Sequence, residues 1–272
     1  MSRTEPLVGY RADVMSAITR YVALGDSFTE GIGDPDPASR NGVRGWADLV
    51  AAHLALNHPE FRYANLAIRG HTMDAVLGGQ LRPAITLQPD LVTIYAGIND
   101  LLRLRTDLDA MMTRYAHALA LLRRTGARVM TFTAADIGTV PVLRRLRGRA
   151  AIYNELLRTI VDDLGLELVD CWRFSEFRDP CLWDSDRVHL GPLGHRRMAG
   201  RVLDALAVPH NLNGAPDAVP TSYADRVSRL RSDLHWAAGF AAPWVIRRLR
   251  RVTPGAGVEP KLASLTAPVR VL

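Results

Sequence analysis

Apolar residues along the chain follow two alternating periodicities, which predict a succession of strands and helices. Five short runs rich in Val, Ile, Leu and aromatic residues are typical of buried strands, and each is followed by a turn signal. These runs are residues 21–24, 61–66, 91–96, 128–133 and 167–169. Longer segments repeat apolar residues at helical spacing. They are residues 46–56, 108–122, 152–164 and 193–206.

The order of these elements predicts the fold class. Strands that alternate with helices through short connections form a parallel sheet covered by helices on both faces. In such a sheet, functional side chains collect just beyond the carboxyl ends of the strands. We therefore expect the site among the turns at residues 25–27, 67–70, 97–100 and 133–136, and in the long loop that follows the fifth strand and reaches His189.

Composition is consistent with one α/β domain and two flanking segments. The 272 residues are 48% hydrophobic with a mean hydropathy of −0.01, which is typical of a globular protein. We assign residues 1–19 to an N-terminal leader, 20–210 to the catalytic domain and 211–272 to a C-terminal tail. The chain has no apolar run near the roughly 20 residues of a spanning helix and no signal-peptide pattern, so we expect a cytoplasmic protein.

The positive charge of the chain is concentrated in the tail. The net charge is +6, and residues 211–272 contribute nine basic against four acidic residues. Only one of the 34 basic residues, Lys261, is a lysine. The two cysteines, Cys171 and Cys181, are interpreted as reduced thiols, since a zinc site would need more ligands nearby. We predict no metal and no cofactor.

The tail combines an almost wholly apolar segment, residues 234–246, with an arginine cluster directly after it. We expect a helical tail that packs Trp236, Phe240 and Trp244 on the catalytic domain. A segment that contacts a membrane surface is the main alternative, and a partner or dimer surface is another. Nucleic-acid binding is not expected, because no recognition motif surrounds the arginines.

Candidate chemistry begins with Ser27, which directly follows the first predicted strand. A serine hydroxyl is a poor nucleophile unless a base removes its proton and donors stabilise the oxyanion. His189 is the best-placed base, and Asp186, three residues earlier, is spaced to orient its imidazole. The backbone N–H groups of Ser27 and Gly70, with the side-chain amide of Asn99, could form a three-donor oxyanion hole.

Four short blocks of the sequence resemble those of the GDSL, or SGNH, hydrolase family, in the same order. Residues 25–31 (Gly-Asp-Ser-Phe-Thr-Glu-Gly) resemble the first block, with Phe28 in place of leucine, and Gly70 the second. Residues 97–100 and 186–189 resemble the third and fourth. The resemblance covers about residues 20 to 208.

This resemblance implies a nucleophile at Ser27, a base at His189 and an orienting carboxylate at Asp186. It also implies that Gly70 and Asn99 complete the oxyanion hole. The implied fold is a flavodoxin-like, three-layer α/β/α sandwich with a five-stranded parallel sheet. The expected activity is serine-dependent hydrolysis of a small-molecule carboxylic ester through an acyl-enzyme.

Alternative functions use the same site. One is acyl transfer, in which an alcohol replaces water, and another is deacetylation of O-acetylated sugars. A catalytically silent binding protein is a third, although such a protein would not need all five residues. Individual residues also have structural interpretations: Ser27 or Asn99 as a helix cap, Asp26 as a turn residue, Asp100 as a cap, and His195 as a surface or cap histidine.

Overall fold

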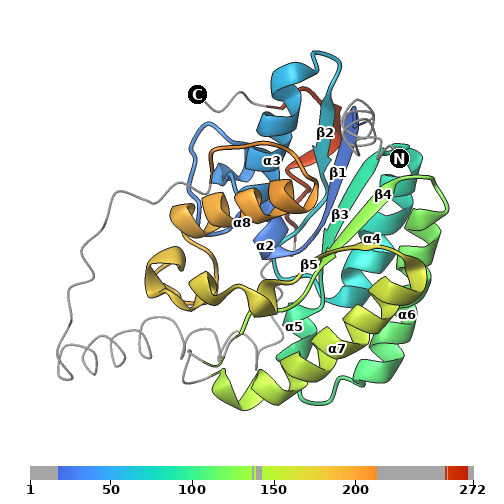
Figure 1. Ribbon diagram of the computed structural model, residues 1–272, viewed down its shortest axis with the longest axis vertical. Coiled ribbons are helices and arrows are strands. Elements are labelled where there is room, and N and C mark those ends of the chain that lie inside the picture. The colour runs from blue at the N-terminus through green and yellow to red at the C-terminus, as the bar shows by residue number, and fades with distance from the viewer. Residues whose placement is uncertain (1–17, 137, 139–142, 213–254, 256, 269–272) are drawn as a thin grey trace, which may run out of the picture.

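The computed structural model describes residues 18–136, 138, 143–212, 255 and 257–268, and it contains a six-stranded sheet (Figure 1). The strand order is β5-β4-β3-β1-β2-β6. The strands are β1 (Arg20–Gly25), β2 (Arg62–Asn65), β3 (Leu91–Tyr95), β4 (Arg128–Phe132), β5 (Glu167–Val169) and β6 (Leu262–Thr266). The first five are parallel and have the flavodoxin-like order, which confirms the predicted class.

Strand β1 at the centre of the sheet shows why its sequence is a continuous apolar run. All its residues after Arg20 are buried, because helices cover both faces of the sheet. Tyr21 and Ala23 pack into the core on one face, whereas Val22 and Leu24 pack into the core on the other. The buried Tyr21 hydroxyl lies 2.8 Å from the hydroxyl of Thr93 on β3, so neighbouring strands are also tied through side chains.

Two helical layers enclose the sheet (Figure 1). Helices α3 (Trp46–Leu54) and α8 (Pro192–Ala205) bury their apolar residues in the core of one face. Helices α4 (Met73–Thr86), α6 (Leu108–Arg123) and α7 (Arg147–Leu164) do so on the other face. The four helices predicted from periodicity are present as α3, α6, α7 and α8.

Helix α4 was not predicted from the sequence. It contains Gly78, Gly79 and Pro83, and these residues weaken any helical pattern because of their low intrinsic propensity. Its first turn is fixed from outside, since the Asp100 carboxylate accepts a 2.7 Å hydrogen bond from the Met73 N–H. Asp100 is therefore a cap, as expected, but of α4 rather than of its own helix.

Strand β6 adds a sixth strand to the five that were predicted, and it lies in the segment that was predicted as a helical tail. It pairs antiparallel with β2, with Thr266 opposite Tyr63 and Leu262 opposite Asn65. Its five residues are all partly or fully exposed, so they lack the buried run that marks the other strands. An edge strand of this kind is specified by the free edge of its partner rather than by its own apolar pattern.

The remaining expectations about the tail lie outside the described residues. They concern Trp236, Phe240 and Trp244, and both packing on the domain and membrane contact stay predictions. The same holds for residues 1–17 of the predicted leader. None of the helices in the described part of the chain is both long enough and apolar enough to cross a membrane.

Candidate active site

Four loops at the carboxyl edge of the sheet carry the five predicted site residues. Ser27 opens the short helix α2 (Ser27–Glu30) directly after β1, and Gly70 lies in the turn after β2. Asn99 belongs to the short helix α5 (Ile98–Leu101) after β3. The loop after β5 carries Asp186 and His189. Parallel strands bring these loops to one edge although they are far apart in sequence.

Ser27, His189 and Asp186 form a continuous hydrogen-bonded chain. The Ser27 Oγ lies 2.8 Å from His189 Nε2, and His189 Nδ1 lies 2.6 Å from Asp186 Oδ2. Because an ionised carboxylate only accepts hydrogen bonds, the imidazole carries its proton on Nδ1. This leaves Nε2 as the acceptor for the serine hydroxyl, which is the arrangement of a base paired with a nucleophile.

The Asp186 carboxylate is held by its own loop. Its Oδ1 accepts hydrogen bonds from the backbone N–H groups of Val188 at 2.8 Å and His189 at 2.9 Å, so the other oxygen points at the imidazole. Burial alone would raise the pKa of Asp186. The hydrogen bonds from the His189 ring and from these two amides outweigh burial and lower it, which keeps the carboxylate ionised at neutral pH.

Aromatic side chains support the imidazole while leaving it accessible. The Phe28 ring centroid lies 5.9 Å from that of His189, and 5.3 Å and 6.4 Å from the rings of Tyr95 and Trp183. The side chain of His189 keeps 21% of its surface exposed. A substrate can therefore reach the histidine from solvent, while the packed ring of Phe28 limits its rotation.

Two backbone N–H groups are available as oxyanion donors. The Ser27 N–H is at the first position of α2, and within the described residues neither it nor the Gly70 N–H has a hydrogen-bond acceptor. Gly70 has a φ of +77°, a left-handed conformation that favours glycine. Among the described residues, the backbone donor at this position therefore has no acceptor.

The third predicted donor, the side-chain amide of Asn99, is engaged on both of its hydrogens. Its Nδ2 donates to Asp26 Oδ2 at 3.0 Å and to the backbone carbonyl of His71 at 2.9 Å. An oxyanion would have to compete with the His71 carbonyl for one of these hydrogens. The two bonds also join three of the four loops to one another.

Asp26 is a buried carboxylate beside Ser27, and its expected role was mainly that of a turn residue that bonds the backbone. Its side chain caps α2 by accepting the Phe28 N–H at 3.2 Å, and it also receives the Asn99 amide. Burial raises the pKa of Asp26 to about 7, and the bonds from Phe28 and Asn99 and the charge of His189 act against that rise. The group therefore titrates near neutral pH.

Further positioning residues were missed because their partners are distant in sequence. The side chain of Gln80 forms two 2.8 Å hydrogen bonds with the backbone of Gly25: its Oε1 accepts the Gly25 N–H, and its Nε2 donates to the Gly25 carbonyl. The buried Glu30 carboxylate accepts the Arg69 N–H at 2.7 Å, next to Gly70. Glu30 stands between Thr29 and Gly31 in the first block, and its partner Arg69 is 39 positions away, so no local pattern indicated this contact.

His195 is a core residue and not a surface histidine. It is fully buried, its Nε2 donates to the Ile32 carbonyl at 3.0 Å, and its Nδ1 accepts the Trp46 N–H at 3.1 Å. It therefore caps the start of α3 from another helix. Burial lowers the pKa of His195 to about 4, so it remains neutral at physiological pH.

Cys171 is buried and Cys181 is exposed, and both are free thiols. Among the described residues, no group of three or more His, Cys, Asp or Glu side chains is arranged to hold a metal ion.

Comparisons with known proteins identify the family of the chain. The family model described as the GDSL-like lipase/acylhydrolase family matches residues 23–197. A search of curated proteins gave no match.

Several solved structures share the fold. LAE5, an alpha/beta hydrolase enzyme from the metagenome of Lake Arreo in Spain, is 24% identical, with a TM-score of 0.58 over 71% of this chain and 97% of its own. The acetyl xylan esterase AlAXEase is 21% identical, with a TM-score of 0.57 over 68% of this chain and 98% of its own.

Axe2, an acetylxylan esterase from Geobacillus stearothermophilus, is 19% identical, with a TM-score of 0.57 over 71% of this chain and 97% of its own. At these identities the similarity establishes the fold. The family match, which covers more than half of the chain, establishes the family. The chain therefore belongs to the GDSL-like lipase/acylhydrolase family and is a carboxylic ester hydrolase.

Proposed function

We propose that this protein hydrolyses carboxylic esters through an acyl-enzyme on Ser27, with His189 as general base and Asp186 as the residue that orients it. The observation that carries the proposal is the hydrogen-bonded chain from Ser27 Oγ to His189 Nε2 at 2.8 Å and from His189 Nδ1 to Asp186 Oδ2 at 2.6 Å. This arrangement provides both the activated hydroxyl and the fixed tautomer that acyl transfer to serine requires.

Acylation follows from the positions of these atoms. The Ser27 Oγ attacks the ester carbonyl carbon while its proton passes to His189 Nε2, which forms a tetrahedral intermediate and an imidazolium. The ionised Asp186 stabilises the imidazolium. When the intermediate collapses, the carbon–oxygen bond to the alcohol breaks and His189 returns the proton to the leaving oxygen.

Deacylation repeats the sequence with water. His189 removes a proton from the water as its oxygen attacks the acyl carbon, and the second tetrahedral intermediate expels the Ser27 oxygen, which takes the proton back. In both intermediates the negative oxygen is stabilised by the N–H groups of Ser27 and Gly70. The amide of Asn99 supplies the third donor by exchanging its bond to the His71 carbonyl for one to the oxyanion.

The proposed substrate is a small-molecule ester, and a substrate panel can measure which acyl and alcohol groups the enzyme prefers. The names of AlAXEase and Axe2 identify acetylated xylan as the substrate class of those proteins. We therefore include acetylated xylo-oligosaccharides in a substrate panel, beside p-nitrophenyl esters of increasing acyl length. A higher kcat/KM for acetylated sugars than for p-nitrophenyl acetate would favour the deacetylase alternative.

Labelling by a fluorophosphonate tests the nucleophile directly. The wild-type protein should gain the mass of one phosphonyl group, located on Ser27 by peptide mass spectrometry, and lose activity in proportion. Ser27→Ala should not be labelled, and its kcat should fall about 10⁴-fold or more. Ser175→Ala is the matched control, because Ser175 is exposed at the start of a short helical turn, and it should be labelled as the wild type is. Turnover retained by Ser27→Ala would overturn the proposal.

A further inference from the structure

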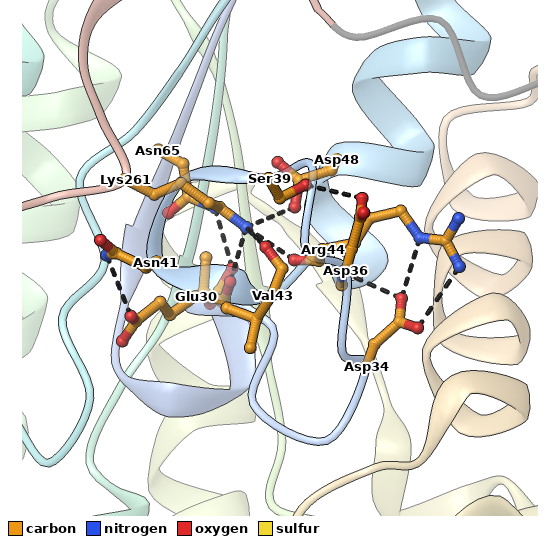
Figure 2. A network of polar contacts seen from close by, with 12 residues as sticks. Glu30, Asp34, Asp36, Ser39, Asn41, Val43, Arg44, Asp48, Asn65 and Lys261 are labelled. Carbon is orange, nitrogen blue, oxygen red and sulfur yellow. Dashed lines mark hydrogen bonds and ion pairs between the residues drawn. The ribbon is translucent and has the colours of Figure 1, made fainter.

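Lys261, the single lysine of the chain, lies buried directly before β6 and reaches into the loops that follow β1 (Figure 2). Its Nζ donates to the backbone carbonyls of Glu30 and Arg44 at 2.6 Å each and to that of Val43 at 3.2 Å. It also forms an ion pair with Asp48 at 2.5 Å. Four acceptors thus surround an ammonium group that has three hydrogens to donate.

A buried ammonium is retained in a fold only when its charge and its donors are satisfied. Asp48, on the first turns of α3, supplies the opposite charge. Burial raises the pKa of Asp48 to about 6, and the charge and the hydrogen bond of Lys261 act against that rise. Asp48 is therefore ionised at neutral pH, and its ion pair with Lys261 joins the C-terminal segment to α3.

The bond to Glu30 connects Lys261 to the helix that carries Ser27. Helix α2 has only four residues, so the carbonyls at its end need partners outside the helix. Asn65 Nδ2 donates to the Thr29 carbonyl at 2.9 Å, and Lys261 donates to that of Glu30. A cation at this end of a helix is also favoured by the partial negative charge of its carbonyls.

The side chain of Glu30 also binds the loop that carries Gly70, whose N–H is the second proposed oxyanion donor. Its Oε2 accepts the Arg69 N–H at 2.7 Å and the Arg69 Nε at 3.1 Å, immediately before Gly70. Residue 255, at the start of the same C-terminal segment, also packs against this loop, since a Cβ on Gly255 would lie 2.3 Å from the Arg69 carbonyl. Glu30 is thus bonded through its backbone to Lys261 and through its carboxylate to the loop of Gly70.

We propose that Lys261 is a positioning residue for the oxyanion hole. By fixing Glu30, it sets the distance between α2, which provides the Ser27 N–H, and the turn that provides the Gly70 N–H. The C-terminal strand, which follows a long segment beyond the catalytic domain, therefore contributes to transition-state stabilisation without touching the substrate. This inference rests on the proposed function of Ser27.

The test compares two variants of the full-length protein that break the same ion pair. Lys261→Met removes the donor to Glu30, whereas Asp48→Asn leaves that donor in place. For Lys261→Met, we expect kcat to fall about 10- to 100-fold with KM within twofold. Loss of the hydrogen bond to Glu30 displaces the N–H groups of Ser27 and Gly70, and these donors act on charge that develops only in the transition state. For Asp48→Asn, we expect kcat within threefold of the wild type although its melting temperature falls.

A transition-state analogue provides a readout that general destabilisation would not move. The inhibition constant of an alkylboronic acid, which forms a tetrahedral adduct on serine, should rise in Lys261→Met by about the factor by which kcat falls. All measurements are made well below the melting temperature of each variant. If Lys261→Met does not fold, Lys261→Gln takes its place. Because the glutamine amide keeps a shorter, neutral donor, we expect a smaller loss of kcat, again with a rise of the inhibition constant by the same factor.

Two results would overturn the inference. One is a lysine variant with wild-type kcat and boronate affinity but a lower melting temperature, which would make Lys261 a stabilising residue only. The other is an equal loss of kcat in Asp48→Asn. Failure of the proposed function is recognised separately, because Ser27→Ala would then retain turnover whatever the effect at Lys261.

Discussion

The Asp26 carboxylate accepts a 3.0 Å hydrogen bond from the side-chain amide of Asn99, so the residue just before Ser27 holds the side chain that we propose as the third oxyanion donor. Above pH 7, where Asp26 is ionised, this bond is charge-assisted, and neither sequence block suggests it by itself. It makes Asp26 a positioning residue for Asn99, and the first prediction concerns this pair.

At a pH above 7, where Asp26 is ionised, we expect Asp26→Asn to lower kcat about 10- to 100-fold with little change in KM, because the Asn99 amide loses an anionic acceptor. Steady-state kinetics on a p-nitrophenyl ester measure this effect. If Asp26 acts through Asn99, the double variant Asp26→Asn/Asn99→Ala should be no slower than Asn99→Ala alone. Additive losses would show that Asp26 acts independently. Asp107→Ala, which removes the cap of the remote helix α6, should leave kcat unchanged and serves as the control.

Asn99→Ala should lower kcat by roughly 10²–10³ at nearly constant KM, since a preorganised donor acts on charge that appears only in the transition state. Both hydrogens of the Asn99 amide already have acceptors, one of them the His71 carbonyl, so the donor is shared in the resting site. A variant with raised KM and unchanged kcat would make Asn99 a substrate-binding residue instead.

Asp186→Asn should lower kcat by about 10⁴, the magnitude known for the corresponding change in serine proteases, because an amide nitrogen facing Nδ1 favours the wrong imidazole tautomer. The rate constant for phosphonylation of Ser27 by a fluorophosphonate should fall by a similar factor, since the same base activates Ser27. An effect below tenfold would mean that another group orients His189.

The loss of folding stability at acid pH should depend in part on His195. Burial lowers its pKa from 6.5 to about 4, so in this interval the unfolded chain binds a proton that the folded protein does not. The free energy of unfolding should therefore fall as the pH falls from about 6.5 to about 4. Urea titrations at a series of pH values should show a shallower decline for His195→Gln than for the wild type. His117→Gln, at an exposed position on α6, should keep the slope of the wild type. Equal slopes for His195→Gln and the wild type would contradict this account.

Two glycines with positive φ should differ sharply in their tolerance of alanine. Gly31 has a φ of +105° and a Cβ there would lie 1.9 Å from the Arg44 carbonyl, whereas Gly42, with a φ of +71°, faces open space. Gly42→Ala should cost about 1–2 kcal/mol of unfolding free energy from backbone conformation alone. Gly31→Ala should cost clearly more, because the Arg44 backbone must also move. Equilibrium unfolding in urea checks both values, and similar costs for the two variants would argue against a tight contact at Gly31.

The apolar pattern by itself was sufficient to predict the five parallel strands and four of the main helices. Each parallel strand is buried on both faces, so its sequence is a continuous apolar run that few other structures produce. The candidate site could also be predicted in outline. Since the carboxyl ends of parallel strands share one edge, Ser27, Gly70, Asn99 and His189 had to lie near one another once the strands were assigned.

Only the tertiary structure decided which polar groups meet within that edge. The sequence does not indicate that the Asn99 amide donates its two hydrogens to Asp26 and to the His71 carbonyl. It also does not indicate that His195 is buried against the start of α3. Such contacts depend on distances of a few ångströms, whereas topology places residues only to within a loop.

The same reason applies to the C-terminal segment, where the difference is largest. Nothing local to β6 marks it as a strand, because an exposed edge strand receives its conformation from β2. Lys261 and Asp48 are 213 positions apart, and their pairing appears only when that strand is in place. The sequence by itself determines structure most clearly for a strand that is buried on both faces, because such a strand is a continuous apolar run. An exposed edge strand such as β6 is positioned by the strand it pairs with, so its place is defined only by the complete fold.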